Sequence, residues 1–131
     1  MTRVLVIDDD LSIRQVIVYA LADEGYQVDE AADGWAALAL VGRQHPDIIL
    51  VDMKMPSMDG WEFVKRYRAL YDHRAAIIVL TAALDAAKRG EEVDAESYMS
   101  KPFDLDVLVE RVSALAGVKS PDRSIPSSGQ G

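Results

Sequence analysis

The sequence predicts an α/β fold, namely a doubly wound, five-stranded parallel sheet with helices on both faces. Short apolar runs alternate with longer segments in which apolar residues recur at helical spacing, and this alternation occurs five times along the chain. Parallel strands need crossover connections, which helices supply on the two faces of such a sheet. With 131 residues, of which 50% are hydrophobic and 27% charged, the chain has the size and composition of one globular domain.

The boundaries of most elements are marked by residues that start or stop regular structure. The first apolar run, residues 4–7, ends in three aspartates. Gly25 is expected to end the first helix in a left-handed conformation, Pro46 ends the second helix, and Asp59 caps the third. The helix over residues 84–94 has few apolar positions and a central glycine, so we expect it to be short and mobile. The predicted strands cover residues 4–7, 27–31, 48–51, 77–80 and 97–100, and the predicted helices begin near residues 11, 34, 59, 84 and 104.

The composition of these strands predicts their order in the sheet. The strands at 4–7, 48–51 and 77–80 are wholly apolar and belong in the centre, whereas those at 27–31 and 97–100 carry polar residues and belong at the edges. This pattern matches the order 2-1-3-4-5 of the flavodoxin-like fold. Ligands of such sheets bind outside the carboxyl ends of the strands, where the direction of winding reverses between the first strand and the third.

Chemically active side chains follow several of these strand ends. Asp8 and Asp9 follow the first predicted strand, Asp52 follows the third, and Thr81 and Lys101 follow the fourth and fifth. Three carboxylates at one edge would repel one another unless a cation neutralised them, and a hard divalent cation such as Mg²⁺ or Mn²⁺ prefers oxygen ligands of this kind. Asp52 could then attack phosphorus to form an aspartyl phosphate, while Lys101 and Thr81 neutralise the phosphoryl oxygens.

Four short motifs stand out in the chain: Val6-Ile7-Asp8-Asp9-Asp10, Asp52-Met53-Lys54-Met55-Pro56 with Asp59-Gly60, Thr81-Ala82, and Tyr98-Met99-Ser100-Lys101-Pro102-Phe103. Together they resemble the receiver domain of bacterial two-component response regulators. The resemblance covers about residues 3 to 116, and the joint pattern is specific although each motif alone is weak. It implies a receiver domain over residues 1–117, and the Ser, Pro and Gly residues beyond it predict a flexible tail or linker stub over residues 118–131.

The resemblance implies a role for each acid. Asp52 would be the phosphoacceptor, charged by the phosphohistidine of a sensor kinase or of a phosphotransfer protein. Asp9 and Asp52 would bind the metal directly, together with the backbone carbonyl of Lys54, and Asp8 would bind it through water. The protein would not be an enzyme in the usual sense, but a phosphoacceptor with self-catalysed phosphorylation and dephosphorylation.

The resemblance also implies a switch. Lys101 and Thr81 would contact the phosphoryl group as the catalytic residues, and the Tyr98 ring would turn inward into the space that Thr81 leaves. The surface of the fourth and fifth strands and the fourth helix would change, and this surface would control a downstream effector or output domain or form a phosphorylation-linked homodimer. Lys101-Pro102 would be a cis peptide. The chain departs from the family at Asp94, where a glycine is expected, and in the somewhat short segment between Thr81 and Lys101.

Two other hypotheses remain open from the sequence. Asp8-Asp9-Asp10 also resembles the Asp-x-Asp motif of haloacid-dehalogenase-type phosphatases, with Asp8 as nucleophile, Asp10 as acid and base, and Thr81 and Lys101 downstream. That hypothesis leaves Asp52 without a role. A degenerate receiver, in contrast, would act only as a binding module. Acetyl phosphate with Mg²⁺ separates these cases, because label on Asp8 would contradict the receiver hypothesis.

Charge and composition exclude several classes of function. A formal net charge of −8 argues against direct nucleic acid binding and against binding to anionic membranes, because both depend on clustered Lys and Arg. The chain has no cysteine, so it has no disulfide and no thiolate metal site. The first residues lead directly into a strand and no apolar stretch approaches the roughly 20 residues of a membrane span, so we expect a cytoplasmic protein. His45 and His73 are expected to face solvent, and Trp35 and Trp61 to be partly buried on helices.

Overall fold

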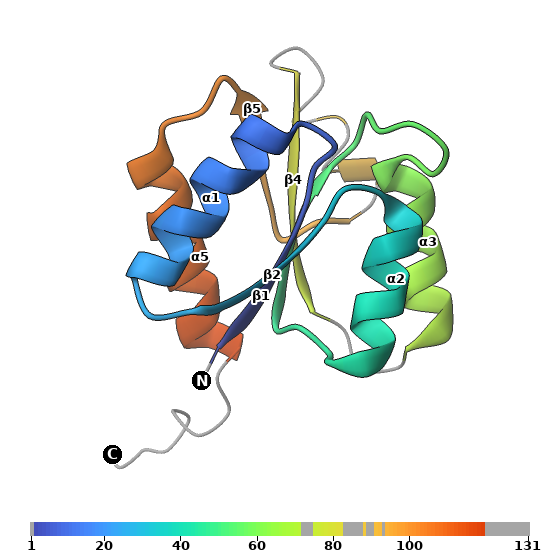
Figure 1. Cartoon of the computed structure of the whole chain (residues 1–131), viewed down its shortest axis with the longest axis horizontal. Helices are drawn as coiled ribbons and strands as arrows, with labels where there is room; N and C mark the ends of the chain where they lie inside the picture. The colour runs from blue at the N-terminus through green and yellow to red at the C-terminus, as the bar shows by residue number, and fades with distance from the viewer. Residues whose placement is uncertain (1, 72–74, 83–87, 89–90, 93, 120–131) are drawn as a thin grey trace.

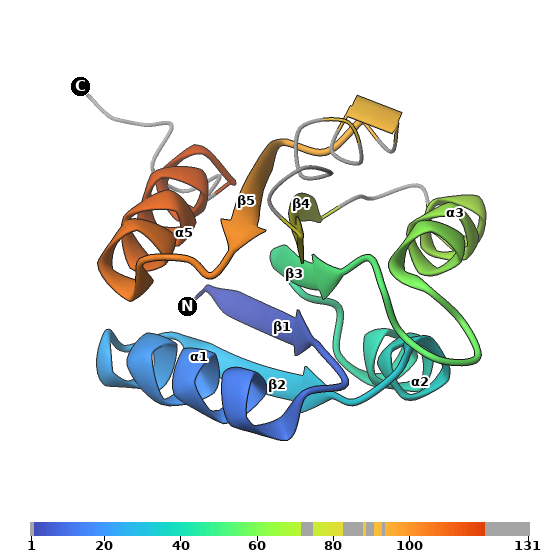
Figure 2. The same cartoon turned by 90° about the horizontal axis from the view of Figure 1, so that it is seen from above.

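A parallel sheet of five strands forms the centre of the molecule, in the predicted order β2-β1-β3-β4-β5. The structure, a computed structural model, describes residues 2–71, 75–82, 88, 91–92 and 94–119. Helices α1 and α5 cover one face of the sheet, and α2 and α3 cover the other (Figures 1 and 2). The strands are β1 (Arg3–Ile7), β2 (Gln27–Ala31), β3 (Ile48–Asp52), β4 (Ala76–Ala82) and β5 (Ser97–Lys101), and the helices are α1 (Leu11–Asp23), α2 (Gly34–Arg43), α3 (Gly60–Leu70) and α5 (Leu105–Lys119).

Two hydrophobic cores lie on the two faces of the sheet, because successive side chains of a strand point to opposite faces. In β1, Leu5 and Ile7 pack with α2 and α3, whereas Val4 and Val6 pack with α1 and α5. Every residue of β3 is buried, which accounts for its unbroken apolar run. The two strands with polar residues, β2 and β5, lie at the edges as predicted.

Aspartate side chains cap the N-termini of α1, α2 and α3. Asp10, Asp33 and Asp59 each accept a hydrogen bond from the backbone N–H three residues later, at 2.8 to 3.1 Å. At the other end of α1, Gly25 has a φ of 97°, which confirms the predicted left-handed conformation. These caps fix where each helix leaves the carboxyl edge of the sheet, and the candidate site lies at that edge.

Two predicted segments are described only in part. Helix α5 extends to Lys119 and so includes the first two residues of the predicted tail, which starts at residue 118, and residues 120–131 lie outside the described residues. The predicted short helix over residues 84–94 also lies largely outside them, so its mobility stays a prediction. At its end, Asp94 has a φ of 53°, the left-handed conformation that the expected glycine would adopt more readily. None of the described helices is both long and apolar enough to cross a membrane.

The predictions for the histidine and tryptophan side chains are partly wrong. His45 is half-buried rather than solvated, because its ring packs against Tyr67 and Tyr71 and its Nε2 lies 3.0 Å from Tyr67 Oη. Trp35 and Trp61 lie on helices as expected, but they are 54% and 49% exposed. His73 lies outside the described residues. The periodicity of apolar residues does not reveal contacts such as that of His45 with Tyr67, since these contacts depend on which segments are neighbours in space.

Candidate functional site

Three carboxylates meet at the carboxyl edge of the sheet, as the strand order predicts. Asp8 and Asp9 follow β1, and Asp52 ends the adjacent strand β3. One carboxylate oxygen from each of the three residues lies within 4.8 Å of the others. Asp8 and Asp52 are buried, whereas Asp9 is exposed. The cluster therefore combines two desolvated charges with one that faces solvent.

Lys101, at the end of β5, bridges the two buried acids. Its Nζ lies 2.8 Å from Asp8 Oδ2 and 3.0 Å from Asp52 Oδ2. Burial raises the pKa of Asp52, although the hydrogen bonds from the Lys54 N–H and from Lys101 oppose this effect. Burial alone would lower the pKa of Lys101, but the hydrogen bonds and charges of Asp8 and Asp52 outweigh it and raise that pKa. Lys101 thus stays protonated and partly neutralises the cluster.

Local hydrogen bonds fix the backbone and side chain of Asp8. Its Oδ1 accepts from the Asp10 N–H at 2.9 Å, and its own N–H donates to the carbonyl of Ala31 at 3.2 Å. Its carbonyl accepts from Nη1 of Arg14 at 2.7 Å. Arg14 was not among the residues that the sequence predicted for the site. The only available signal was a cationic side chain on the first turns of the helix that follows the acids.

Asp52 is held by the loop that leads from β3 to α3. Its Oδ1 accepts from the Lys54 N–H at 3.1 Å. Gly60 starts α3 directly against the Asp52 backbone, since a Cβ on Gly60 would lie 2.5 Å from the Asp52 carbonyl oxygen. The Gly60 N–H in turn donates to the Met53 carbonyl at 3.2 Å. Glycine is therefore required here for close approach, and the predicted metal contact of the Lys54 carbonyl stays a prediction.

The two residues of the predicted switch lie on neighbouring strands. Thr81 is buried near the end of β4, and its Oγ1 has no hydrogen-bond partner among the described residues. Tyr98, on β5, pairs with Val79 in the sheet register, and its side chain is 42% exposed. The Lys101-Pro102 peptide is cis, as predicted. The inward turn of the Tyr98 ring stays a prediction.

The position of Asp10 does not favour the phosphatase hypothesis. That hypothesis uses Asp10 as the acid and base beside Asp8. In the structure, Asp10 is the N-cap of α1, and its Oδ1 accepts from the Ile13 N–H at 3.1 Å. Its carboxylate therefore serves the helix terminus, and it is not one of the three acids that cluster at the sheet edge.

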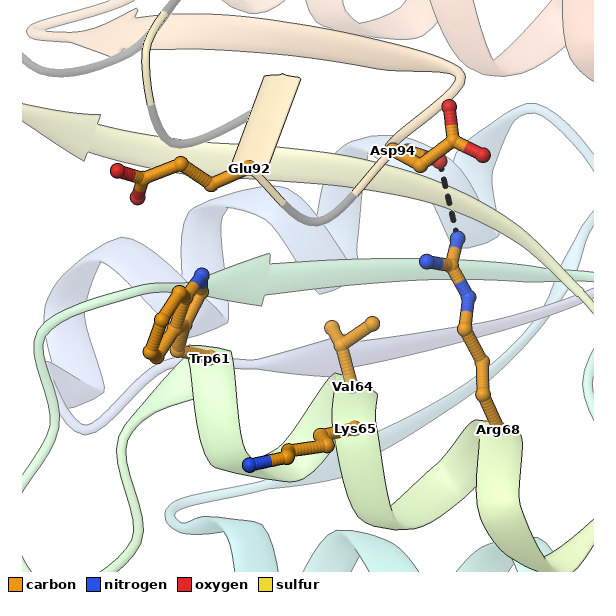
Figure 3. A pocket seen from close by; sticks show the side chains of 6 residues that line it. All are labelled: Trp61, Val64, Lys65, Arg68, Glu92 and Asp94. Atoms are coloured by element: carbon orange, nitrogen blue, oxygen red, sulfur yellow. Dashed lines mark hydrogen bonds between the residues drawn. The ribbon is translucent and has the colours of Figure 1, made fainter.

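A separate pocket of about 370 Å³ lies between α3 and the residues that precede β5 (Figure 3). Arg68 of α3 donates from Nη2 to the carbonyl of Asp94 at 3.0 Å, and this bond ties the left-handed Asp94 to α3. The pocket shares no lining residue with the acid cluster. Its lining residues are Trp61, Val64, Lys65, Arg68, Glu92 and Asp94.

Known proteins share both the sequence pattern and the fold. Residues 4–113 match the family model described as the response regulator receiver domain. Sporulation initiation phosphotransferase F of Bacillus subtilis is 37% identical over 120 residues, which are 90% of this chain and 96% of that protein. Response regulator MprA of Mycobacterium sp. is 38% identical over 122 residues, which are 92% of this chain but 53% of that protein. The chain thus spans about half the length of this second relative.

Solved structures of receiver domains and of a chemotaxis protein share the fold of this chain. The receiver domain of the Francisella response regulator 1452 superposes with a TM-score of 0.82 at 31% identity, and the match covers 92% of this chain and 100% of that one. Chemotaxis protein CheY4 of Vibrio cholerae superposes with a TM-score of 0.76 at 37% identity, over 88% of this chain and 98% of that one. This chain belongs to the family of response regulator receiver domains.

Proposed function

We propose that the chain is a phosphorylation-dependent signalling switch of a two-component system, in which Asp52 accepts a phosphoryl group from a phosphohistidine. The proposal depends mainly on the cluster of Asp8, Asp9 and Asp52, with Lys101 bound to the two buried acids. Phosphoryl transfer to a carboxylate needs a positioned nucleophile and cations that neutralise the transferred oxygens. Family membership supports the same chemistry.

The donor set of this site fits a divalent cation such as Mg²⁺ or Mn²⁺. Its three carboxylate oxygens are hard ligands within 4.8 Å of one another. Asp9 faces solvent, which suits a cation that keeps several water molecules as ligands. Asp9, Asp52 and the backbone carbonyl of Lys54 would bind the cation directly, and Asp8 would bind it through water. When bound, the cation would neutralise charge on the phosphoryl oxygens in the transition state.

The remaining steps belong to the side chains of this chain. An oxygen of Asp52 attacks phosphorus, and the bond from phosphorus to the donor's imidazole nitrogen breaks. The Lys101 ammonium, which contacts Asp52 Oδ2 in the structure, shifts its hydrogen bond to a phosphoryl oxygen. Thr81 supplies a second donor, because its buried hydroxyl has no partner among the described residues. Tyr98 would then turn inward and alter the face of β4 and β5, to which the downstream effector or output domain responds.

An apolar groove beside Lys101 supports a docking site for the phosphohistidine donor, either a sensor kinase or a phosphotransfer protein. The side chain of Val16 on α1, which lines this groove, is 51% exposed. Exposed apolar surface next to a reactive group is typical of a protein interaction site. The groove is lined by Ser12, Ile13, Val16, Lys101, Pro102, Phe103 and Leu105.

Labelling with acetyl phosphate in the presence of Mg²⁺ tests the proposal. Intact-mass spectrometry should show one added phosphoryl group, and peptide mapping should locate it on Asp52. Asp52→Asn should remove the label, and chelation of the metal should slow labelling strongly. After the reagent is removed, loss of the label should report self-catalysed dephosphorylation. A label on Asp8, or normal labelling of Asp52→Asn, would contradict the proposed function.

A further inference from the structure

Arg14 connects three parts of the molecule at the edge of the acid cluster. Its Nη1 donates to the Asp8 carbonyl at 2.7 Å, and its Nε donates to Oε1 of Glu30 at 2.8 Å. The Arg14 side chain is 13% exposed, whereas that of Glu30 is 44% exposed. The guanidinium therefore links α1, the loop after β1 and the edge strand β2. Neither contact has a role in the proposed phosphoryl chemistry.

The Asp8 carbonyl belongs to the peptide group that joins Asp8 to Asp9. The Asp8 carboxylate is fixed separately, by the Asp10 N–H and by Lys101. The Asp9 carboxylate is exposed, and no hydrogen bond among the described residues holds it. Because Asp9 extends from the peptide group that Arg14 holds, the direction of its side chain depends on that peptide plane.

We propose that Arg14 is a positioning residue, which orients the peptide between Asp8 and Asp9 and thereby sets the affinity of the site for a divalent cation. The inference rests on the proposed function, in which Asp9 is a direct ligand. Groups that orient metal ligands typically change affinity by 10- to 100-fold. Arg14 acts through the backbone rather than on a ligand atom, so its removal should weaken Mg²⁺ binding by roughly three- to tenfold.

A simple charge effect of Arg14 predicts the opposite sign. A guanidinium near three carboxylates reduces their attraction for a cation, so loss of its charge alone should tighten Mg²⁺ binding. Loss of orientation should weaken binding. The direction of the change in Mg²⁺ affinity therefore distinguishes a positioning role from a charge effect. A matched variant distinguishes the positioning role from a general loss of stability.

Arg3 provides that matched variant. Like Arg14, it binds the edge strand β2, here from β1, with Nη1 at 3.0 Å from Asp29 Oδ2 and Nη2 at 2.6 Å from Gln27 Oε1. Its side chain is 22% exposed. It lies at the opposite end of β1, five residues from Asp8, or roughly 16 Å along the strand. Arg3→Met should thus lower stability about as much as Arg14→Met, but should leave the metal site unchanged.

The test measures the Mg²⁺ affinity of the full chain by tryptophan fluorescence and calorimetry, with melting temperatures recorded in parallel. We expect weaker binding for Arg14→Met, and also for Arg14→Lys, because an ammonium keeps the charge but cannot hold two partners in the planar geometry of a guanidinium. Arg3→Met should bind Mg²⁺ like the wild type.

The outcomes separate this inference from the proposed function. If the wild type does not bind Mg²⁺, the proposed metal site itself is wrong. If the wild type binds and Arg14→Met binds equally well or more tightly, the positioning role is overturned while the proposed function stands. If Arg14→Met does not melt cooperatively, the Mg²⁺ affinity of Arg14→Lys is the test instead. A wild-type Mg²⁺ affinity in Arg14→Lys would overturn the inference.

Discussion

Burial disfavours the ionised form of Asp52, so the stability of the protein should depend on pH. Burial raises its pKa above the ordinary value of 3.8, so the folded protein binds this proton more tightly than the unfolded chain does. The stabilisation from that proton is present at low pH and is lost as pH rises through the raised pKa. In metal-free buffer at pH 7, Asp52→Asn should therefore increase the free energy of unfolding by on the order of 1 kcal/mol.

This gain should shrink as pH falls towards 3.8, because Asp52 of the wild type then becomes protonated as well. Urea unfolding at a series of pH values measures the difference. Asp23→Asn, which removes an exposed carboxylate on α1, is the control and should gain much less. A gain for Asp52→Asn that is independent of pH would contradict the argument.

Thr81 is a second residue that, in our proposal, lowers stability but serves the function. A buried hydroxyl without a partner costs roughly 1 to 3 kcal/mol, and Thr81 Oγ1 has none among the described residues. Thr81→Val should increase stability by about 1 kcal/mol while it slows phosphorylation by acetyl phosphate. Thr81→Ser keeps the hydroxyl and should label at close to the wild-type rate. Lower stability of Thr81→Val would show that the hydroxyl has a partner.

The members of the acid cluster could be predicted from sequence, but some of their contacts could not. Asp8 and Asp9 follow β1 and Asp52 ends β3, and the apolar composition of these two strands places them next to each other, so the meeting of the acids follows from strand order. The hydrogen bond from Arg14 to the Asp8 carbonyl has no such signal in the sequence. Every residue has a backbone carbonyl, so only the folded structure shows which one Arg14 reaches. The bridge from Lys101 to two carboxylates was likewise unexpected, since Lys101 was predicted to bind the phosphoryl group.

At the scale of elements, the junction between β3 and α3 couples the site to the core. Gly60 packs so closely on Asp52 and Met53 that a Cβ would lie 2.5 Å from one backbone oxygen and 2.8 Å from a Cα. Gly60→Ala must displace the loop or the helix, so it should destabilise the protein by about 1 to 3 kcal/mol. It should also weaken Mg²⁺ binding, because Asp52 would shift.

Gly42→Ala in α2 is the matched control for this prediction. A Cβ there would lie 3.6 Å from the Tyr71 hydroxyl, an ordinary contact. Alanine is favoured over glycine inside a helix, so Gly42→Ala should stabilise the protein by up to about 1 kcal/mol. Urea unfolding of both variants provides the comparison. Equal behaviour of the two variants would show that the approach of α3 to Asp52 is not tight.

The elements differ in how well their composition predicts them. The strands and the capped helices were predictable because burial on one or both sides imposes a repeating apolar pattern, as in β3, where every residue is buried. The His45 contact with Tyr67 was missed because it joins the segment after α2 to the last turn of α3, and these segments neighbour each other only in the folded chain. Asp94 shows a third case, since its left-handed backbone is held by Arg68 from another element.

At the scale of the whole molecule, the topology brings together residues that are far apart in the chain. Lys101 and Asp8 are separated by 93 positions, and Lys101 and Asp52 by 49. A bound cation would therefore connect β1 and β3 at the edge where Lys101 joins them to β5. Since it would bind only the folded arrangement, it should stabilise the entire domain rather than one loop.

Metal addition and removal test this coupling. With a dissociation constant on the order of 1 mM, 10 mM Mg²⁺ should add about 1.4 kcal/mol to the free energy of unfolding, and excess chelator should remove the gain. The expected rise in melting temperature is roughly 3 to 8 °C. Asp9→Asn should abolish this rise. Because Asp9 is exposed and is one of three like charges, its neutralisation should not destabilise the metal-free protein. A Mg²⁺-dependent rise that persists in Asp9→Asn would place the cation elsewhere on this acidic chain.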